Sequence, residues 1–374
     1  MPPTAATPPT ALSWLRRRLS SHLPESSIRK LFRSETVRLF DPATGQVKRA
    51  ARDRPLPPGA QLLVPRSALP SAVDGQTGCA RPRRAPAPAS PAASQARAEW
   101  LRRLRASLVH QDADLLAINK PAGLAVQGGS GLALSVDDLM REAFGQLLPD
   151  AGAGLRLVHR LDKETSGLLL LARHADAATW LGEAFRAGAA GGGGGRGGGS
   201  SGGGAAVRKM YFALVDCRGD TPSFPVEGSI DRPVAPRSGT GAAGGAPVPA
   251  LTRYRGLEAG RGLAWLQLQP LTGRKHQLRV HCAQALGAPI LGDARYAPAR
   301  ASPAQQAATD ALHSMGVLGG RTLPSNLPLF LHCRGLEVRR PGVARPLPLM
   351  APLPLHWRAL LQWAGWPLPQ GEDT

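Results

Sequence analysis

Ionisable and polar side chains crowd into one short stretch between two apolar runs. The stretch His159–Gly167 reads HRLDKETSG, and it separates Leu155–Val158 from Leu168–Leu171, both long enough to form strands. A carboxylate on a turn between buried strands lies at the edge of the sheet, half-shielded from water, where it could act as an oriented nucleophile or base. Asp162 is that carboxylate. The same residues could instead form an ordinary charged turn, in which Asp162 only accepts hydrogen bonds from backbone amides.

A second segment, Thr272–His281, concentrates cations and reads TGRKHQLRVH. Thr272 could cap the turn that follows it, and the glycine, arginines and histidines suit the binding of phosphate. Apolar residues recur at every fourth position from Leu278 to Leu286, which is helical spacing and would place Arg279 beside the buried face. An arginine held there would need a carboxylate partner, and Asp162 is the natural candidate. The alternative is a basic amphipathic helix on the surface.

A third segment places a tyrosine just after two cations. Tyr211 follows Arg208 and Lys209 at the start of an apolar run, and the whole chain contains only 3 tyrosines. A ring at the open end of a strand could stack on a nucleic-acid base. Packing of the ring against the protein core is the commoner alternative.

Together these segments resemble the signature blocks of the RluA-type family of RNA pseudouridine synthases. Five blocks occur in the order that the family shows, and the resemblance spans roughly residues 108–345. The blocks are Ala117–Gly123, His159–Gly167, Lys209–Tyr211, Thr272–Asp293 and Leu329–Cys333. Residues 11–66 resemble the S4-like RNA-binding module that often precedes this domain.

The resemblance implies a role for individual residues of this chain. Asp162 would be the catalytic carboxylate that drives cleavage of the N-glycosidic bond, after which the uracil turns and rejoins the sugar through carbon. Tyr211 would stack on the target base and take part in proton transfer, and Arg279 would pair with Asp162. Arg160 would help to extrude the uridine, and Leu331 would line the pocket. The other residues that we expect to bind the substrate are His159, Arg274 and Lys120.

The fold that the resemblance implies is α+β. It consists of a central mixed or antiparallel sheet, flanked by helices and carrying a catalytic cleft, preceded by the small α/β S4-like module. Strand-sized apolar runs recur at Leu115–Ile118, Leu155–Val158, Leu168–Leu171, Tyr211–Val215, Leu263–Leu268 and Leu329–Leu331. Helical patterns lie near Val136–Leu147, Ala175–Ala187 and Lys275–Leu286.

Composition divides the chain into segments. We expect the S4-like module at 11–66, a disordered linker rich in Pro, Ala, Ser and Arg at 67–97, and the catalytic domain at 100–366. Glycine-rich insertions, which cannot hold one conformation, interrupt the catalytic domain at 188–204 and 237–249. A third insertion, at about 298–325, is less biased in composition and could contain a helix.

The chain carries a formal net charge of +20, which suits a polyanionic partner such as RNA. A GC-rich genome would also inflate the arginine content, so charge alone does not decide. Residues 1–105 carry a net charge of +13, with 19 Lys and Arg against 6 Asp and Glu. We therefore expect an RNA-binding arm in the first module, formed by Arg29, Lys30 and Arg33.

No metal or cofactor is expected. The 4 cysteines form no CxxC pair, and adjacent residues such as His281 and Cys282 point in different directions, which disfavours a metal site. A GxGxxG match at 239–244 follows no apolar strand, so no nucleotide cofactor is expected. Isomerisation of uridine involves no net redox change or hydrolysis.

The start of the chain bears on localisation. No apolar run approaches the roughly 18 residues that a membrane-spanning helix needs, so no membrane partner is expected. Met1–Leu23 is basic and lacks acidic residues, which favours a mitochondrion, with a chloroplast or the cytoplasm as alternatives. We expect a monomeric enzyme whose partner is rRNA, tRNA or organellar mRNA. The alternative function is a non-catalytic RNA-binding or ribosome-assembly factor on the same fold.

Overall fold

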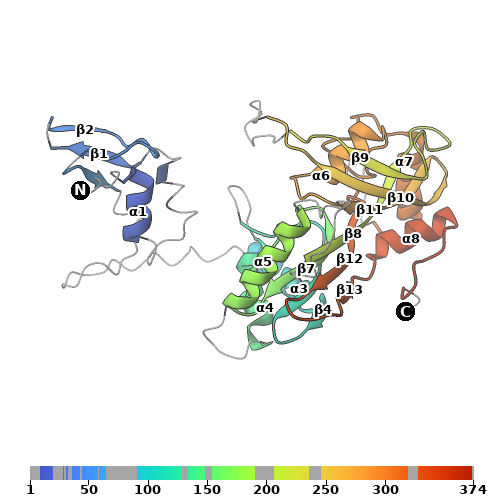
Figure 1. Ribbon diagram of the computed structural model, residues 1–374. Coiled ribbons are helices and arrows are strands. Elements are labelled where there is room, and N and C mark those ends of the chain that lie inside the picture. The colour runs from blue at the N-terminus through green and yellow to red at the C-terminus, as the bar shows by residue number, and fades with distance from the viewer. Residues whose placement is uncertain are drawn as a thin grey trace. The chain divides into compact units, whose positions relative to one another are not determined.

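The chain forms two compact units, Met1–Pro88 and Ala89–Thr374. The computed structural model describes residues 9–19, 28, 31–32, 36–42, 44–57, 59–64, 91–128, 134–147, 154–189, 206–235, 246–318 and 327–372. Figure 1 labels the helices and strands of both units.

The first unit is a small α/β module. Helix α1 (Ala11–Leu19) accompanies an antiparallel sheet of order β2-β1-β3, built from β1 (Arg38–Asp41), β2 (Gln46–Arg49) and β3 (Gln61–Leu63). Its core contains Ala11, Leu12, Leu15, Ile28, Phe32, Val37 and Ala50. The S4-like identity of this module stays a prediction. Arg29, Lys30 and Arg33 lie outside the described residues.

The second unit begins earlier than expected. Helix α3 (Pro91–Arg105) occupies residues 91–97, which we had assigned to the linker, so that assignment is wrong for these seven positions. The helix forms because Leu101 and Leu104 are buried against the main core while its arginines and glutamate face outward. The rest of the expected linker lies outside the described residues.

A central mixed sheet organises the second unit, as expected, and it has ten strands. Its order is β4-β5-β7-β12-β8-β11-β10-β9, with β13 paired to β12 and β6 paired to β7. The β7–β12 pair is parallel and the other pairs are antiparallel. The strands are β4 (Leu108–Gln111), β5 (Leu115–Lys120), β6 (Arg156–Leu157), β7 (Ser166–Ala172), β8 (Ala206–Asp216), β9 (Glu227–Asp231), β10 (Leu251–Gly260), β11 (Leu263–Pro270), β12 (Leu331–Arg339) and β13 (Leu347–Met350).

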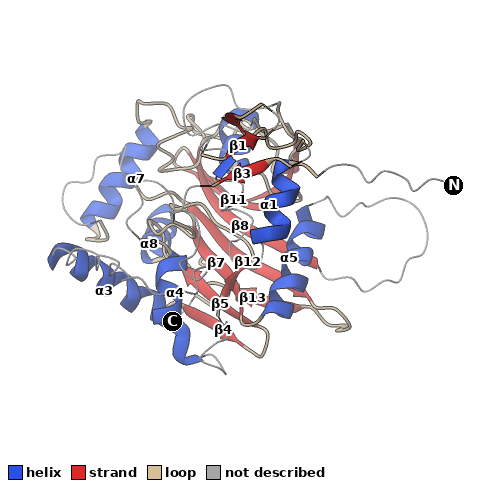
Figure 2. Ribbon diagram, turned by 90° about the vertical axis from the view of Figure 1, so that its left-hand side faces the viewer, coloured by secondary structure: helices blue, strands red, loops and turns tan. Residues whose placement is uncertain are grey.

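Helices cover the sheet in two groups, each with its own apolar core. Helices α3, α4 (Val136–Phe144) and α5 (Ala175–Ala189) pack with β5 and β7. Helices α7 (Pro303–Ser314) and α8 (Leu355–Ala364) pack with β8 and β11. Figures 1 and 2 show these groups over different parts of the sheet. Tyr211 contacts both cores, so it lies at the boundary between them.

Several predicted elements have different bounds. The helix expected at Lys275–Leu286 is a short α6 (Gln277–Val280) followed by a π-helix (His281–Ala285). The Thr272 hydroxyl donates a hydrogen bond to the Gln277 side chain, and that side chain in turn accepts the Arg274 amide. The last core strand begins at Leu331, where the expected run ends. Helix α7 confirms a helix in the third insertion, whereas 190–205 and 236–245 lie outside the described residues.

The central β7–β12 pair depends on a glycine. Gly167 has a φ of +108°, and a Cβ atom there would collide with the backbone of Cys333 on β12. The hydroxyl of Ser166, which precedes Gly167 on β7, lies 2.9 Å from Nδ1 of the buried His332 on β12. The start of β7, and with it the loop that carries Asp162, is therefore held closely against β12.

Candidate active site

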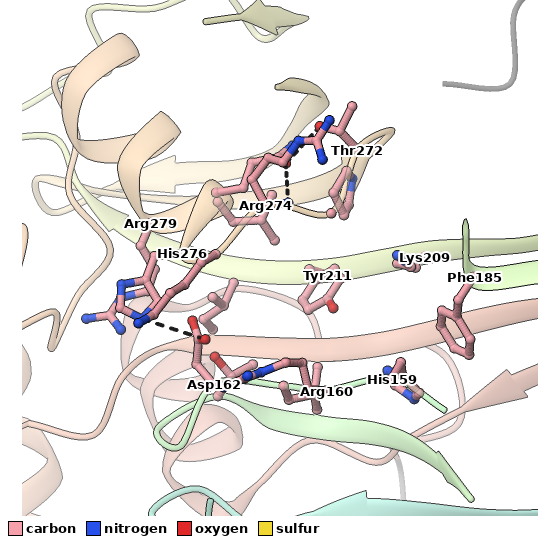
Figure 3. A pocket seen from close by; sticks show the side chains of 18 residues that line it. His159, Arg160, Asp162, Phe185, Lys209, Tyr211, Thr272, Arg274, His276 and Arg279 are labelled. Carbon is pink, nitrogen blue, oxygen red and sulfur yellow. Dashed lines mark hydrogen bonds and ion pairs between the residues drawn. The ribbon is translucent and has the colours of Figure 1, made fainter. Parts of the chain in front are cut away.

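A cavity of about 460 Å³ opens where four segments of the second unit meet. These segments are the turn before β7, the middle of β8, the stretch from the end of β11 into α6 and the first residue of β12, and α5 adds Phe185. Seven of the eight residues that we expected in the catalytic site line the cavity (Figure 3). They are His159, Arg160, Asp162, Tyr211, Arg274, Arg279 and Leu331.

Asp162 occupies the turn before β7. Its backbone carbonyl accepts a hydrogen bond from the Thr165 amide at 3.2 Å, which closes the turn. Its side chain is 23% exposed, so it is shielded yet accessible from the cavity. Of the described residues that line the cavity, Asp162 alone bears a carboxylate. A carboxylate that faces an open cavity can serve as a nucleophile or a general base.

His276 is the partner of Asp162, whereas the sequence analysis counted it only among the residues that suit the binding of phosphate. Its Nε2 lies 3.7 Å from the Asp162 carboxylate, and its Nδ1 lies 2.9 Å from the Tyr296 hydroxyl. His276 adopts a left-handed backbone conformation with a φ of 56°, which directs its ring toward Asp162 (Figure 3). Burial lowers the pKa of His276, although the charge of Asp162 opposes that effect. The imidazole therefore favours its neutral form.

The expected direct pair between Arg279 and Asp162 is not present. The Arg279 guanidinium instead donates hydrogen bonds from Nε and Nη2 to the two carboxylate oxygens of Asp293, at 2.8 and 2.6 Å. Burial would lower the pKa of Arg279, but Asp293 raises it, and the charge of Asp162 adds to that rise. Arg279 thus lies near Asp162 without a direct ion pair between the two side chains. The sequence could not show this, because Asp293 and Asp162 were equally available partners.

Tyr211 lines the cavity from β8 and is partly exposed. Burial, with smaller effects of the Cys333 thiol and the Asp162 charge, raises the pKa of the Tyr211 hydroxyl well above its usual value of 10.0. The hydroxyl therefore keeps its proton near neutral pH. A protonated tyrosine beside an open space can present its ring to a base and its hydroxyl as a hydrogen-bond donor.

His159 is a fixed part of the cavity wall. Its Nε2 accepts the Leu170 amide hydrogen at 2.8 Å, and its ring stacks on Phe185 with a centroid separation of 4.2 Å. Burial and the charge of Lys209 lower the pKa of His159 to about 3. The ring is therefore neutral and already bonded through Nε2, which suits it for packing rather than for proton transfer. The sequence analysis did not assign a role to Phe185 or to the Lys209 side chain.

Lys120 is the expected substrate-binding residue that does not line the cavity. It is fully buried, and its ammonium group donates hydrogen bonds to the carbonyls of Pro121, Leu124 and Lys163 at 2.8, 2.9 and 3.1 Å. Burial lowers its pKa to about 7, against the opposing charges of Glu164 and Asp162. Lys120 therefore supports the loop next to Asp162. The prediction that Lys120 contacts the substrate is wrong.

The remaining expected residues lie at the rim and on the floor of the cavity. Arg160 and Arg274 are exposed, and Nε of Arg274 donates a hydrogen bond to the Pro249 carbonyl at 3.1 Å. Leu331 is buried at the start of β12. Exposed cations around a single carboxylate suit a polyanionic substrate. Within the described ranges, no cluster of three or more His, Cys, Asp or Glu side chains could hold a metal ion. No helix in the part of the chain described here is both long and apolar enough to span a membrane.

Comparison with known proteins identifies related chains. The sequence profile of the RNA pseudouridylate synthases matches residues 114–284. Mitochondrial RNA pseudouridine synthase 4 of Arabidopsis thaliana is 36% identical over 307 residues, which are 77% of this chain and 60% of that protein. Mitochondrial pseudouridylate synthase RPUSD4 of Xenopus tropicalis is 33% identical over 300 residues, covering 73% of this chain and 85% of that protein.

A bacterial protein and a solved structure are also similar to this chain. Ribosomal large subunit pseudouridine synthase C of Rickettsia typhi is 32% identical over 258 residues, covering 67% of this chain and 69% of that protein. The solved structure of human RNA pseudouridylate synthase domain containing 4 aligns with a TM-score of 0.55 and 29% identity, over 74% of this chain and 99% of that chain. The names of the Arabidopsis and Xenopus relatives describe those two proteins as mitochondrial.

Proposed function

This chain belongs to the RNA pseudouridine synthase family, and from that premise we propose that it isomerises uridine to pseudouridine within RNA, with Asp162 as the catalytic carboxylate. The observation that carries the assignment of Asp162 is its position. It is the one acid among the described lining residues, it faces the open cavity, and the side chains of His276 and Arg279 lie beside it (Figure 3).

The proposed reaction suits an active site built from side chains alone. The bond between uracil and ribose breaks at nitrogen and re-forms at carbon, and a hydrogen moves from that carbon to the nitrogen, so atoms and electrons balance within one nucleotide. Asp162 would attack or stabilise the sugar when the bond breaks. The ring of Tyr211 would hold the detached uracil, and its hydroxyl would assist the proton transfer.

Arg279 and His276 would position and polarise Asp162. Because Asp293 fixes the guanidinium of Arg279 by two hydrogen bonds, its positive charge stays at one place near the Asp162 carboxylate. A fixed charge costs no reorganisation during the reaction. The neutral imidazole of His276, 3.7 Å from Asp162, leaves the carboxylate free of a tight ion pair that would weaken it as a nucleophile.

The substrate must bring its uridine out of any helix. Extrusion of a nucleotide costs a few kcal/mol, and phosphate contacts with the cations at the rim would offset that cost. Arg160, exposed beside Asp162 in the same turn, would help to extrude the uridine or occupy the space that it leaves. We propose rRNA, tRNA or organellar mRNA as the substrate and a monomer as the working form.

The decisive experiment compares catalysis with binding. Purified protein is incubated with organellar or total RNA, and pseudouridines are mapped. Asp162→Ala should abolish the product while changing RNA affinity little, because Asp162 lies inside a cationic site. Asp162→Asn, which keeps the shape of the side chain, should also be inactive. Equal modification by mutant and wild type would exclude Asp162, and absence of modification by the wild type on every RNA would favour the non-catalytic RNA-binding factor.

A further inference from the structure

The cavity has a second end, away from Asp162. Figure 3 shows Asp162, His276 and Arg279 at one end, Tyr211 in the middle, and Lys209 with Phe185 and His159 at the other. The chemistry proposed above uses only the first end and Tyr211. The second end still contributes a cation and two rings to the cavity wall.

The position of Lys209 follows from the geometry of β8. Lys209 and Tyr211 are two residues apart on one strand, so their side chains leave the same face of the sheet, roughly 7 Å apart along it. The ammonium group of Lys209 lies 5.3 Å from the centre of the Phe185 ring, within the range of a cation–π contact. Phe185 in turn stacks on His159. The three side chains form a layered wall that holds the ammonium group beside the cavity.

The charge of Lys209 is not balanced within the described residues. No carboxylate that the structure describes pairs with it, whereas its neighbour Arg208 lies 3.8 Å from Glu337 on the opposite face of β8. His159 cannot serve as an anionic or accepting partner, because its Nε2 is already bonded to the Leu170 amide. Burial lowers the pKa of Lys209, so an anion bound there would stabilise the charged form.

We propose that Lys209, supported by Phe185 and His159, binds a backbone phosphate of the RNA next to the nucleotide that occupies Asp162 and Tyr211. This inference rests on the proposed function, since it assumes that an RNA strand crosses the cavity with its reacting uridine at the Asp162 end. Lysine is a compact, strongly hydrated point charge that binds phosphate well without requiring a planar partner. The same ammonium could instead contact the edge of a base, and the test below distinguishes the two ligands.

The test uses a matched pair of neighbouring cations. Lys209→Met and Arg208→Met remove one charge each from opposite faces of the same strand. The probe is a short synthetic RNA that carries one uridine, and affinity is measured over a range of salt concentrations. We expect Lys209→Met to weaken binding by about ten-fold and to lower the salt slope by about 1, as the loss of one phosphate contact should. Arg208→Met should leave both nearly unchanged.

A double-mutant cycle identifies the ligand. A set of RNAs is prepared in which one phosphate at a time, on either side of the uridine, is replaced by an uncharged methylphosphonate. At one position the replacement should weaken binding to the wild type but not further to Lys209→Met. If every replacement weakens both proteins equally, Lys209 does not bind a phosphate, and a loss of affinity that follows the neighbouring base instead would identify a base contact.

Folding and catalysis are controlled separately. Thermal unfolding of Lys209→Met should match that of the wild type, and Phe185→Leu, which keeps an apolar side chain but removes the ring, should give a smaller loss of affinity in the same direction. The binding readout does not depend on turnover, so it can be made with Asp162→Ala. Activity that survives Asp162→Ala would overturn the proposed catalytic role alone, whereas unchanged binding by Lys209→Met would overturn this phosphate site alone.

Discussion

Arg279 and Asp293 are joined by two hydrogen bonds, of 2.8 and 2.6 Å, in a largely buried part of the second unit. Oδ1 of Asp293 also accepts the backbone amides of Arg295 and Tyr296, at 2.9 and 3.0 Å. Backbone amides of its own loop therefore hold the Asp293 carboxylate in place independently of Arg279. The guanidinium that faces Asp162 consequently derives its position from a residue outside the cavity.

The first prediction concerns that pair. Asp293→Asn should destabilise the protein by about 3–5 kcal/mol, because it leaves the buried charge of Arg279 without its counter-charge. Urea unfolding measures the change. Glu337→Gln, at the exposed pair with Arg208, is the control and should cost less than about 1 kcal/mol. Similar losses of stability in the two variants would show that the Arg279–Asp293 pair contributes no more to stability than an exposed ion pair does.

The second prediction concerns Lys120. Lys120→Met should destabilise the protein by about 1–3 kcal/mol, because three buried or partly buried hydrogen bonds to carbonyls are lost. Since the loop of Asp162 depends on one of these bonds, turnover should fall more than RNA affinity. The measurement is a comparison of kcat with binding.

Lys120 also predicts a pH dependence of stability. Its folded pKa of about 7 lies below the usual value of 10.5, so between these pH values the unfolded chain binds more protons than the folded one. The wild type should therefore gain stability relative to Lys120→Met as the pH rises from 7 to 8.5. A constant difference across that interval would contradict the lowered pKa.

A third prediction follows from His159. Its folded pKa of about 3 lies below the usual 6.5, so the unfolded chain takes up a proton first as the pH falls. The free energy of unfolding should decrease between pH 6.5 and about pH 3, by up to about 1.4 kcal/mol per pH unit for this residue. His159→Gln should show a shallower decrease in urea unfolding over the same interval. Parallel curves for the two proteins would argue that His159 does not remain neutral.

The fourth prediction concerns the basic first module. Replacing Arg29, Lys30 and Arg33 together by alanine should weaken RNA binding and lower its salt slope by up to about 3. The control replaces Arg97, Arg102 and Arg103 of α3, whose side chains already pair with Glu99 and Glu142. The RNA affinity of both triple variants is measured over a range of salt concentrations. Equal salt slopes for the two variants would contradict the proposed role of the module in RNA binding.

Local patterns predicted much of this structure. The apolar runs that flank Asp162 became β6 and β7, and the helical spacings near Val136 and Ala175 became α4 and α5. These features depend on residues close in sequence, which is why periodicity detects them. The resemblance to the family also implied that Asp162, Tyr211, Arg279 and Leu331 belong to one site, and all four line the same cavity.

Partners chosen at long range were not predictable. Arg279 had two available acids, and only the folded loop of Asp293 decides between them. Lys120 was expected to contact the substrate. Its ammonium group is instead buried and bonded to backbone carbonyls, and no pattern in the sequence predicts which carbonyls will surround a lysine. The Lys209–Phe185 contact joins a strand to a helix across the 190–205 segment, so spacing along the chain carried no signal for it.

Gly167 allows β7 and β12 to approach each other closely beside the cavity. Asp162 lies in the turn that leads into β7, Leu331 begins β12, and the two strands approach closely only because no methyl group stands between Gly167 and Cys333. An alanine at position 167 would push the two strands apart and move the Asp162 carboxylate away from the opposite wall of the cavity. A change at position 167, which does not itself line the cavity, would therefore disturb the turn that holds Asp162.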